Sequence, residues 1–221
     1  MDGVTLAMDA AAGTGSIAVL RDGRVIAERT VVMRSEAEER FLPAVIATLR
    51  DAQVALADCA RIVGGAGPGS FTSLRVVGAA AKGLAQGAGL PLFGVPSLAL
   101  IVAGDDATSE PGSRWLATLD AMRDERYLAL VTIGPRGELA TFESLGLLAH
   151  AQIPARAAEL RAFPIGPDAP HRAAPLARGV ARAFALIVAA GPADLATWEP
   201  VYGRLAEAQV KWEAAQGRPL G

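Results

Sequence analysis

The feature that most constrains the fold is an order of elements that the chain runs through twice. The first series of short apolar runs, typical of an antiparallel meander, comprises residues 4–9, 16–20 and 25–32. The second series comprises residues 115–120, 127–133 and 138–142. Helical periodicity follows each series, and the sheet that a meander forms needs helices to cover its apolar face. The sequence therefore predicts an α/β protein of two lobes, each a mixed sheet covered by helices.

Helices are predicted in both halves of the chain. In the first half, Ser35 and Glu38 form the S-x-x-E pattern of a capping box, and apolar residues at helical spacing follow. Pro43 lies within that helix and predicts a kink or a late start, because proline lacks an N–H and its ring crowds the preceding turn. A second helix is predicted to begin near Ser70. The helices of the second half are expected at residues 154–162 and 175–190.

The boundary between the lobes is expected at residues 104–113, because this segment is rich in Asp, Ser, Gly and Pro. The predicted strand at residues 92–95 is then the last strand of the first half. This divides the chain into an N-terminal lobe, a smaller C-terminal lobe and a C-terminal tail. The three parts are residues 1–104, 105–203 and 204–221.

Charge and cysteine content exclude several classes of function. The net charge is −2 and the sequence pI is about 5.7, so the surface as a whole does not bind nucleic acid tightly by charge alone. Cys59 is the one cysteine, which excludes an intrachain disulfide and fits a reducing, cytoplasmic setting. The longest apolar runs, residues 98–103 and 183–190, are shorter than the roughly 20 residues of a membrane-spanning helix. No membrane role is expected.

The glycine-rich segment 64–70 lies between a predicted strand and a predicted helix. Bare backbone N–H groups at such a turn can bind an anion beside a helix N-terminus, which makes Gly67, Gly69 and Ser70 candidates for nucleotide binding. The segment lacks the Lys-Ser/Thr ending of a Walker loop, and its glycine spacing differs from the dinucleotide fingerprint. The other interpretation is a tight turn that lets the helix pack close to the strand.

Asp9, at the end of the first predicted strand, is a further candidate for nucleotide binding. An acid in this place can hold a metal-bound nucleotide, and it can equally cap a turn. His150 and His171 are isolated in the sequence, so a metal site with histidine ligands is not expected. The charged residues of the first hairpin in the second lobe are interpreted as a solvated tip: Asp120, Arg123, Glu125 and Arg126.

The helix after the glycine-rich turn is almost wholly apolar. Its polar side chains form one narrow stripe, made of Arg75, Lys82 and Gln86. Such a helix needs cover on more than one side. Its own sheet can bury one face, and the small residues Gly78, Ala81 and Ala85 would let a second helix approach closely. The alternative is a helix buried wholly within its own monomer.

Residues 67–76 read Gly-Pro-Gly-Ser-Phe-Thr-Ser-Leu-Arg-Val and closely resemble the G-P-G-S-F-T-G-L-R-[VI] signature of the TsaB (YeaZ) family. Segments similar to this family also lie along most of the chain: the strand with Asp9, Arg40-Phe41-Leu42-Pro43, residues 90–95, residues 119–121 with Tyr127, and residues 199–202. The sequence departs from the family pattern at Ser73, at Val77, and at Ala10-Ala11, where Thr-Ser or Thr-Ala is usual.

The resemblance implies an actin-like ATPase (ribonuclease H-like) fold and a heterodimer with the paralogue TsaD. In this family TsaD holds the metal and transfers the threonylcarbamoyl group to N6 of adenosine 37 in tRNAs that read ANN codons, and the ATPase TsaE joins the complex. ATP and a metal ion are therefore expected in the partner subunits, with no cofactor in this chain and with tRNA reached through the complex. A homodimer in the absence of TsaD is left open.

The resemblance also implies that the first two helices of the N-terminal lobe pack against the same helices of TsaD. The residues expected at this interface are Phe41, Leu42, Val45, Phe71, Leu74, Arg75, Gly78, Ala81, Lys82 and Ala85.

TsaD has an H-x-x-x-H metal motif, and Ser97 and Ile101 stand at the two histidine positions in this chain. The resemblance therefore implies an accessory subunit of the transferase with little or no activity alone, rather than the peptidase that an older glycoprotease-like label suggests. The second interpretation is a self-sufficient small actin-like ATPase or kinase that uses Asp9 and the turn at residues 64–70.

Overall fold

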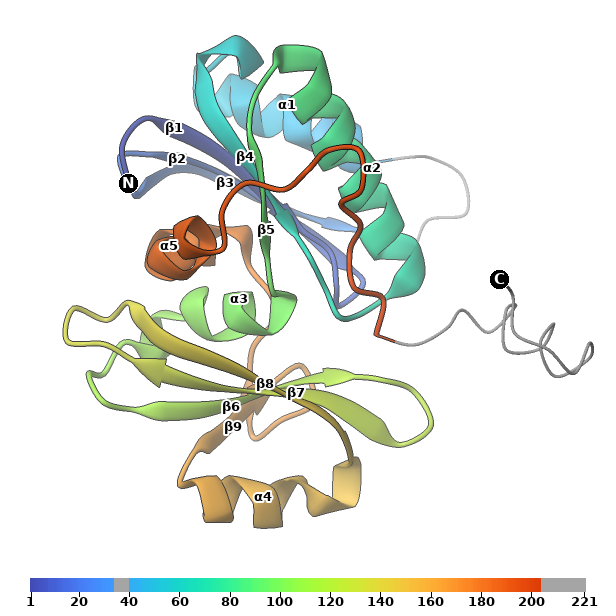
Figure 1. The fold of residues 1–221 in the computed structure, drawn as a ribbon, viewed down its shortest axis with the longest axis vertical. Coiled ribbons are helices and arrows are strands. Elements are labelled where there is room, and N and C mark those ends of the chain that lie inside the picture. The colour runs from blue at the N-terminus through green and yellow to red at the C-terminus, as the bar shows by residue number, and fades with distance from the viewer. Residues whose placement is uncertain (34–39, 204–221) are drawn as a thin grey trace, which may run out of the picture.

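Two five-stranded sheets are stacked along the length of the molecule, with helices between them and on their outer faces (Figure 1). The computed structural model describes residues 1–33 and 40–203. The capping-box residues Ser35 and Glu38 and the tail at residues 204–221 lie outside the described residues.

The first sheet has the strand order β3-β2-β1-β4-β5. The antiparallel meander consists of β1 (Val4–Asp9), β2 (Thr14–Arg21) and β3 (Arg24–Val32). Two further strands, β4 (Cys59–Gly65) and β5 (Leu92–Val95), run parallel to β1. Asp22 and Gly23 join β2 to β3 with positive φ angles of 51° and 80°, as a two-residue hairpin turn requires. The meander predicted from the sequence is confirmed.

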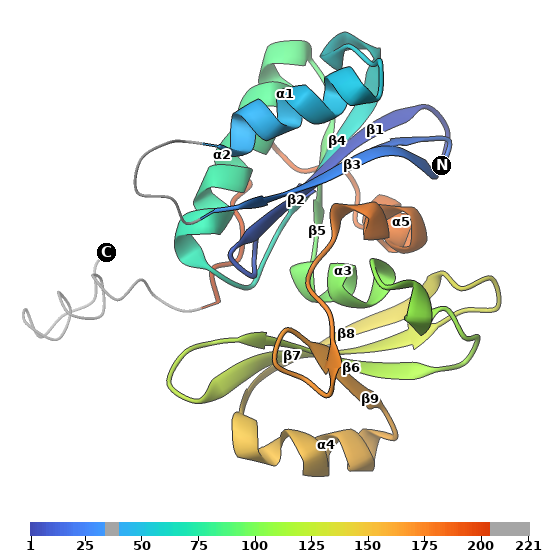
Figure 2. The ribbon, with the colours of Figure 1, turned by 180° about the vertical axis from the view of Figure 1, so that it is seen from behind.

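Two helices, α1 (Phe41–Asp51) and α2 (Phe71–Ala88), cover the outer face of the first sheet (Figure 2). The late start of α1 places Pro43 in its first turn, where a missing N–H costs no helical hydrogen bond. α2 ends at Gly89, whose left-handed φ of 66° lets its N–H bond back to the last turn. Apolar side chains of both helices pack against β1, β2 and β4.

The second sheet has the order β10-β9-β6-β7-β8, which repeats the first when it is read from β8. Its meander consists of β6 (Arg114–Asp120), β7 (Glu125–Ile133) and β8 (Leu139–Ala149). Its parallel strands are β9 (Phe163–Gly166) and β10 (His171–Arg172). α4 (Ile153–Leu160) covers the outer face as α1 does in the first lobe. α2 has no counterpart, because residues 167–170 join β9 directly to β10.

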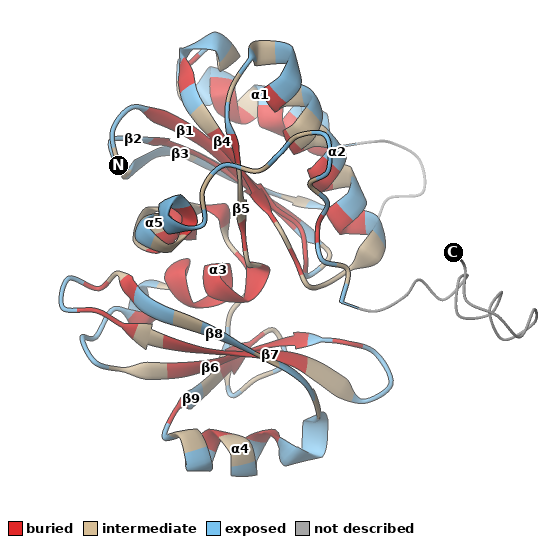
Figure 3. Ribbon diagram, viewed as in Figure 1, coloured by how far each residue is buried: buried red, intermediate tan, exposed pale blue. Residues whose placement is uncertain are grey.

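Two helices, α3 (Ser97–Ala103) and α5 (Val180–Ala189), lie between the sheets. Every residue of α3 is buried, and this helix is red along its length in Figure 3. A continuous apolar core joins Val63 of the first sheet, Leu100 of α3, Trp115 of the second sheet and Ile187 of α5. The two lobes therefore share one core.

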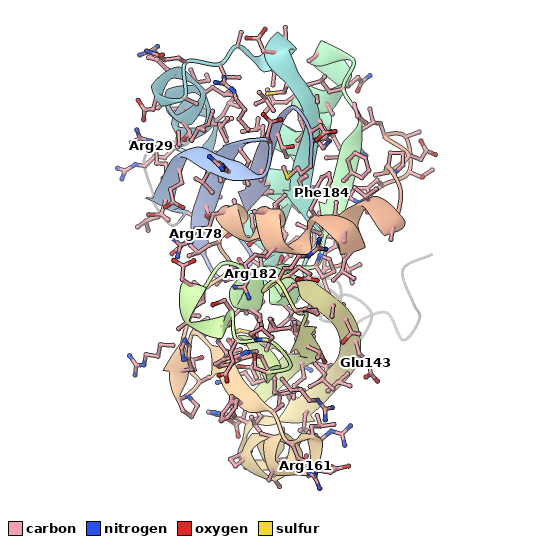
Figure 4. The ribbon with its side chains drawn as sticks, turned by 90° about the vertical axis from the view of Figure 1, so that its left-hand side faces the viewer. Arg29, Glu143, Arg161, Arg178, Arg182 and Phe184 are labelled. Carbon is pink, nitrogen blue, oxygen red and sulfur yellow. The ribbon has the colours of Figure 1, made fainter. Side chains whose placement is uncertain are left out.

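Arginines of α5 and of the turn before it bind the chain where it passes from one lobe to the other (Figure 4). The Arg182 guanidinium donates hydrogen bonds to the carbonyl oxygens of Asp105 (2.9 Å), Thr108 (3.0 Å) and Gly137 (2.6 Å). Arg178 donates to the carbonyl oxygen of Gly104 at 2.8 Å. These bonds fasten the two connections between the lobes to each other.

After α5 the chain returns to the first lobe. Residues 190–203, which we call the strap, pass β5 and follow the side of α2 (orange to red in Figure 1). The Ala193 N–H donates to the Leu92 carbonyl oxygen at 2.7 Å, and the Val201 N–H donates to the Ala66 carbonyl oxygen at 2.8 Å. The division drawn from the sequence counts these residues with the C-terminal lobe, whereas their hydrogen bonds here join them to the first.

Several elements differ from the sequence-based expectation. β8 is longer than predicted, and α5 is shorter because a 3-10 turn at Ala177–Gly179 precedes it. α3, β9 and β10 were not predicted. Within residues 1–33 and 40–203, none of the helices is both long and apolar enough to cross a membrane.

Candidate functional site

Asp9 ends β1 as a fully buried carboxylate whose partners are hydrogen-bond donors of this chain. The Ala11 N–H donates to Oδ1 at 2.8 Å, and the Ser97 hydroxyl donates to Oδ2 at 2.5 Å. The Gly67 N–H donates in turn to the Ser97 Oγ at 3.2 Å. Burial raises the pKa of Asp9, and the hydrogen bonds from Ser97 and Ala11 partly oppose this rise. Asp9 thus ties the first β turn to the glycine-rich turn and α3.

The glycine-rich turn directs most of its backbone donors into the protein. The N–H groups of Ala66, Gly67 and Ser70 bond to Val95, Ser97 and Ala11 respectively, and Pro68 has no N–H. Side chains would not fit in this turn: a β carbon on Gly65 would overlap the Asp9 carboxylate, and one on Gly69 would overlap Ala11. The candidates Asp9, Gly67, Gly69 and Ser70 therefore lie together in a closely packed turn. Nucleotide binding by them stays a prediction.

Three sides of α2 are covered within the chain. Leu74, Val77, Ala81 and Ala85 face the sheet and are fully buried. One flank, made of Val76, Ala80 and Leu84, packs partly buried in the core that includes α1. The opposite flank, made of Phe71, Gly78 and Lys82, is covered by the strap.

The fourth side of α2 faces outward beside α1. We call this surface the outer face, and its exposed residues are Leu42, Pro43 and Ile46 of α1 and Thr72, Arg75, Ala79, Gly83, Gln86 and Gly87 of α2. Leu42 and Ile46 are 41% and 53% exposed, which is high for aliphatic side chains. Among residues 1–33 and 40–203, and apart from the adjoining backbone of α2 itself, no atom lies within 4 Å of the position that a β carbon would take on Gly83 or Gly87. Ala79, Gly83 and Gly87, four residues apart, form an exposed stripe of small residues along the helix.

The interface residues expected from the resemblance fall into two groups. Phe41, Val45, Leu74, Gly78, Ala81 and Ala85 are buried inside this chain. Leu42 and Arg75 are exposed on the outer face, and Phe71 and Lys82 are half-buried beneath the strap. The interface itself stays a prediction, and in this chain Leu42 and Arg75 are its accessible members.

Sequence reasoning missed Ile46, Ala79, Gly83 and Gly87 as surface residues of this face. The signal was present as three small residues spaced by four in α2. The prediction of Gly78, Ala81 and Ala85 as the surface for a second helix is wrong for exposure, because all three are buried in this chain and the sequence does not show which small residues face the sheet or the strap.

The charged hairpin of the second lobe is only partly solvated. Arg123 is exposed, but the Arg126 side chain is 12% exposed and pairs with Asp120 at 2.9 Å and with Asp168 at 3.6 Å. Arg126 and His150 line a cleft of about 550 Å³ beside α4. His171 of β10 lies 2.8 Å from Asp105. Among residues 1–33 and 40–203, no three His, Cys, Asp or Glu side chains are placed to hold a metal ion.

Comparison with known proteins identifies the fold and the family. A family model described as TsaD, tRNA N6-adenosine threonylcarbamoyltransferase, matches residues 31–152. A Pseudomonas aeruginosa protein described as similar to peptidase YEAZ superposes with a TM-score of 0.72 at 28% identity, covering 92% of this chain and 100% of that one. YeaZ from Pseudomonas aeruginosa superposes with a TM-score of 0.68 at 24% identity, covering 91% and 100%.

Several curated relatives are named TsaB. The Escherichia coli K12 tRNA threonylcarbamoyladenosine biosynthesis protein TsaB is 39% identical over 125 residues, which is 56% of this chain and 53% of that protein. The Bacillus subtilis protein of that name is 38% identical over 98 residues, 44% and 43% of the two chains. The matched segments span about half the length of these relatives. With its two actin-like lobes and the matching TsaD model, the chain belongs to the TsaB (YeaZ) family.

Proposed function

We propose that this chain is a non-catalytic accessory subunit in tRNA threonylcarbamoyladenosine biosynthesis, which acts as a scaffold for TsaD and works with the ATPase TsaE in the cytoplasm. The observation that carries the proposal is the outer face of α1 and α2. It combines two exposed aliphatic side chains with a stripe of exposed small residues, a surface to which a second pair of helices can pack closely.

The surroundings of Asp9 support a subunit without chemistry of its own. Asp9 is held by Ser97 and Ala11, and Ile101 is fully buried in the core. The two positions that are histidine in the TsaD motif thus serve a hydrogen bond and apolar packing in this chain. In the proposed complex TsaD supplies the metal and the transfer to N6 of adenosine 37, and tRNA is bound through the complex.

The first test is assembly with TsaD. Size-exclusion chromatography with light scattering should give a stable heterodimer at micromolar concentration, and the chain alone should be run beside it to detect a homodimer. Separate elution of the two proteins would contradict the partnership. Micromolar ATP binding by the chain alone, with turnover lost in Asp9→Asn, would favour the self-sufficient ATPase.

The second test places the interface on the outer face. Ala79→Leu adds a bulky side chain to the stripe of small residues, and we expect at least about tenfold weaker binding to TsaD because overpacking a close contact is costly. Ala155→Leu makes the same change on the exposed side of α4 and should leave affinity unchanged. Equal affinity of the two variants, measured by calorimetry, would refute this placement.

A further inference from the structure

Trp198 of the strap lies over three glycines, Gly64 of β4, Gly94 of β5 and Gly78 of α2. Ideal β carbons would lie 3.5 Å from the Trp198 ring on Gly64 and 3.1 Å from it on Gly94. On Gly78 a β carbon would lie 2.9 Å from Cγ of Pro200 and 3.8 Å from the same ring. A β carbon at Gly78 would press on Pro200 and one at Gly94 would press on the Trp198 ring, whereas at Gly64 it would meet the ring at ordinary contact distance. The surface beneath the strap is therefore shaped to fit it.

Lys82 fastens the strap to α2 by a hydrogen bond from a charged group. Its Nζ donates to the Trp198 carbonyl oxygen at 2.9 Å, across 116 positions of sequence. A bond of this kind is stronger than one between neutral groups. Lys82 is four residues from Gly78, so the lysine and the glycine meet the strap on one flank of α2.

The far end of the strap meets the first turn of α2 and the second lobe together. The Tyr202 ring packs on Phe71 with centroids 4.7 Å apart, and the Arg75 guanidinium lies 5.4 Å from the centre of the Phe71 ring. The Tyr127 hydroxyl, from β7, donates to the Tyr202 carbonyl oxygen at 3.5 Å. Arg75 on the outer face therefore contacts a ring that the strap holds in place.

We propose that the strap is a latch that positions Phe71 and Arg75 for partner binding, so that Lys82 and Trp198 act as positioning residues without themselves belonging to the outer face. This inference rests on the proposed partnership with TsaD. Docking of the latch and binding of the partner are then coupled through the first turns of α2, and each strengthens the other.

The test compares full-length variants at Lys82. Lys82→Met removes the donor and keeps an apolar chain, Lys82→Arg keeps a donor, and Arg136→Met makes the matched change at a side chain that is 88% exposed on the β7–β8 turn. In Lys82→Met the amides of Ala193 and Val201 should exchange at least about tenfold faster by NMR. The first two turns of α2 should also exchange faster, and TsaD should bind about fivefold more weakly. Lys82→Arg should restore all three, and Arg136→Met should change none.

The outcomes separate the latch from the partnership. Faster exchange of the strap with unchanged α2 exchange and unchanged TsaD affinity would overturn the latch, as would unchanged strap exchange in Lys82→Met. Trp198→Ala gives a second test, since wild-type affinity in this folded variant would also overturn it. If the wild-type chain does not bind TsaD, the proposed function fails, and α2 exchange in Lys82→Met alone decides whether the strap positions α2.

Discussion

Asp9 is a fully buried acid whose side chain accepts hydrogen bonds from two other segments of this chain. Its oxygens accept hydrogen bonds from Ser97 and Ala11, and its carboxylate occupies the space that a side chain on Gly65 would need. Burial disfavours the charged form and raises the pKa of Asp9. The residue therefore joins three segments at a cost in stability that depends on pH.

The pH dependence of stability should report this cost. Because the pKa of Asp9 is raised in the folded chain, its contribution to stability is full below the unfolded pKa of about 3.9 and is lost as pH rises through the folded pKa. The amide in Asp9→Asn does not titrate. The free energy of unfolding of this variant, relative to wild type, should therefore increase from about pH 4 up to the folded pKa of Asp9, by about 1.4 kcal/mol for each pH unit between the two. Urea unfolding at a series of pH values measures this difference.

A second variant, expected to change the pH dependence of stability in the opposite direction, checks that Asp9 causes it. Ser97→Ala removes the hydroxyl that favours the charged carboxylate and so raises the pKa of Asp9 further, and the loss of stability with rising pH should extend to higher pH than in the wild type. A flat difference between Asp9→Asn and wild type across the series would show that Asp9 has an ordinary pKa.

The sequence predicted the place of Asp9 but not its partners. A strand that ends in an acid is visible locally, whereas Ser97 is 88 positions away and reaches Asp9 through the packing of α3. The turn at residues 64–70 was open to two interpretations for the same reason. Its hydrogen bonds to Ala11, Val95 and Ser97 favour the tight turn, and no local pattern reveals them.

At the scale of elements, α2 shows what periodicity predicts and what it leaves open. Its start was predicted near Ser70 and lies at Phe71, but a helix that is apolar almost all round does not show which of its residues face the sheet. The cover of the flank at Gly78 comes from the strap, which has no periodic pattern to predict it. α3 was missed for a related reason, since a helix buried on all sides has no polar stripe.

Two glycines of α2 should respond in opposite ways to the same change. Gly83→Ala places a methyl group in open space and should stabilise the chain by about 1 kcal/mol, because alanine has the higher helix propensity. Gly78→Ala brings a β carbon against Pro200 and should destabilise it by about 1–3 kcal/mol, because the strap must shift. Unfolding in urea measures both, with Gly87→Ala as a second open position. A stabilising Gly78→Ala would contradict the docking of the strap.

For the whole molecule, the two sheets repeat one topology, as the order of apolar runs predicted. β1 to β5 correspond to β6 to β10, and the smaller second lobe lacks α2. The short strands β9 and β10 gave too little pattern to be predicted. The sequence also gave no sign that α3 and α5 fill the space between the sheets, because contacts between distant segments leave no local signal.

The junction between the lobes should depend on Arg182 more than on its neighbour. Burial lowers the pKa of Arg182, opposed by Asp106 and Asp105, and its guanidinium donates to several backbone carbonyls there. Arg182→Met removes the donors to the carbonyl oxygens of Thr108 and Gly137 and one of the donors to that of Asp105, and should lower the free energy of unfolding by about 3 kcal/mol. Arg178→Met, which removes one hydrogen bond to a carbonyl oxygen, should cost about 1 kcal/mol. Equal losses in urea unfolding would refute a special role for Arg182.

The return of the strap has a consequence for biosynthesis. A ribosome releases all five strands of the first sheet and the whole of α2 well before residues 193–202 are made. Until then the surface around Gly64, Gly78 and Gly94, which Trp198 later covers, is open to water, although every other part of the first lobe is present. The nascent first lobe thus completes its packing only after the second lobe has been translated, so the two lobes cannot fold to completion one after the other in the order of their synthesis.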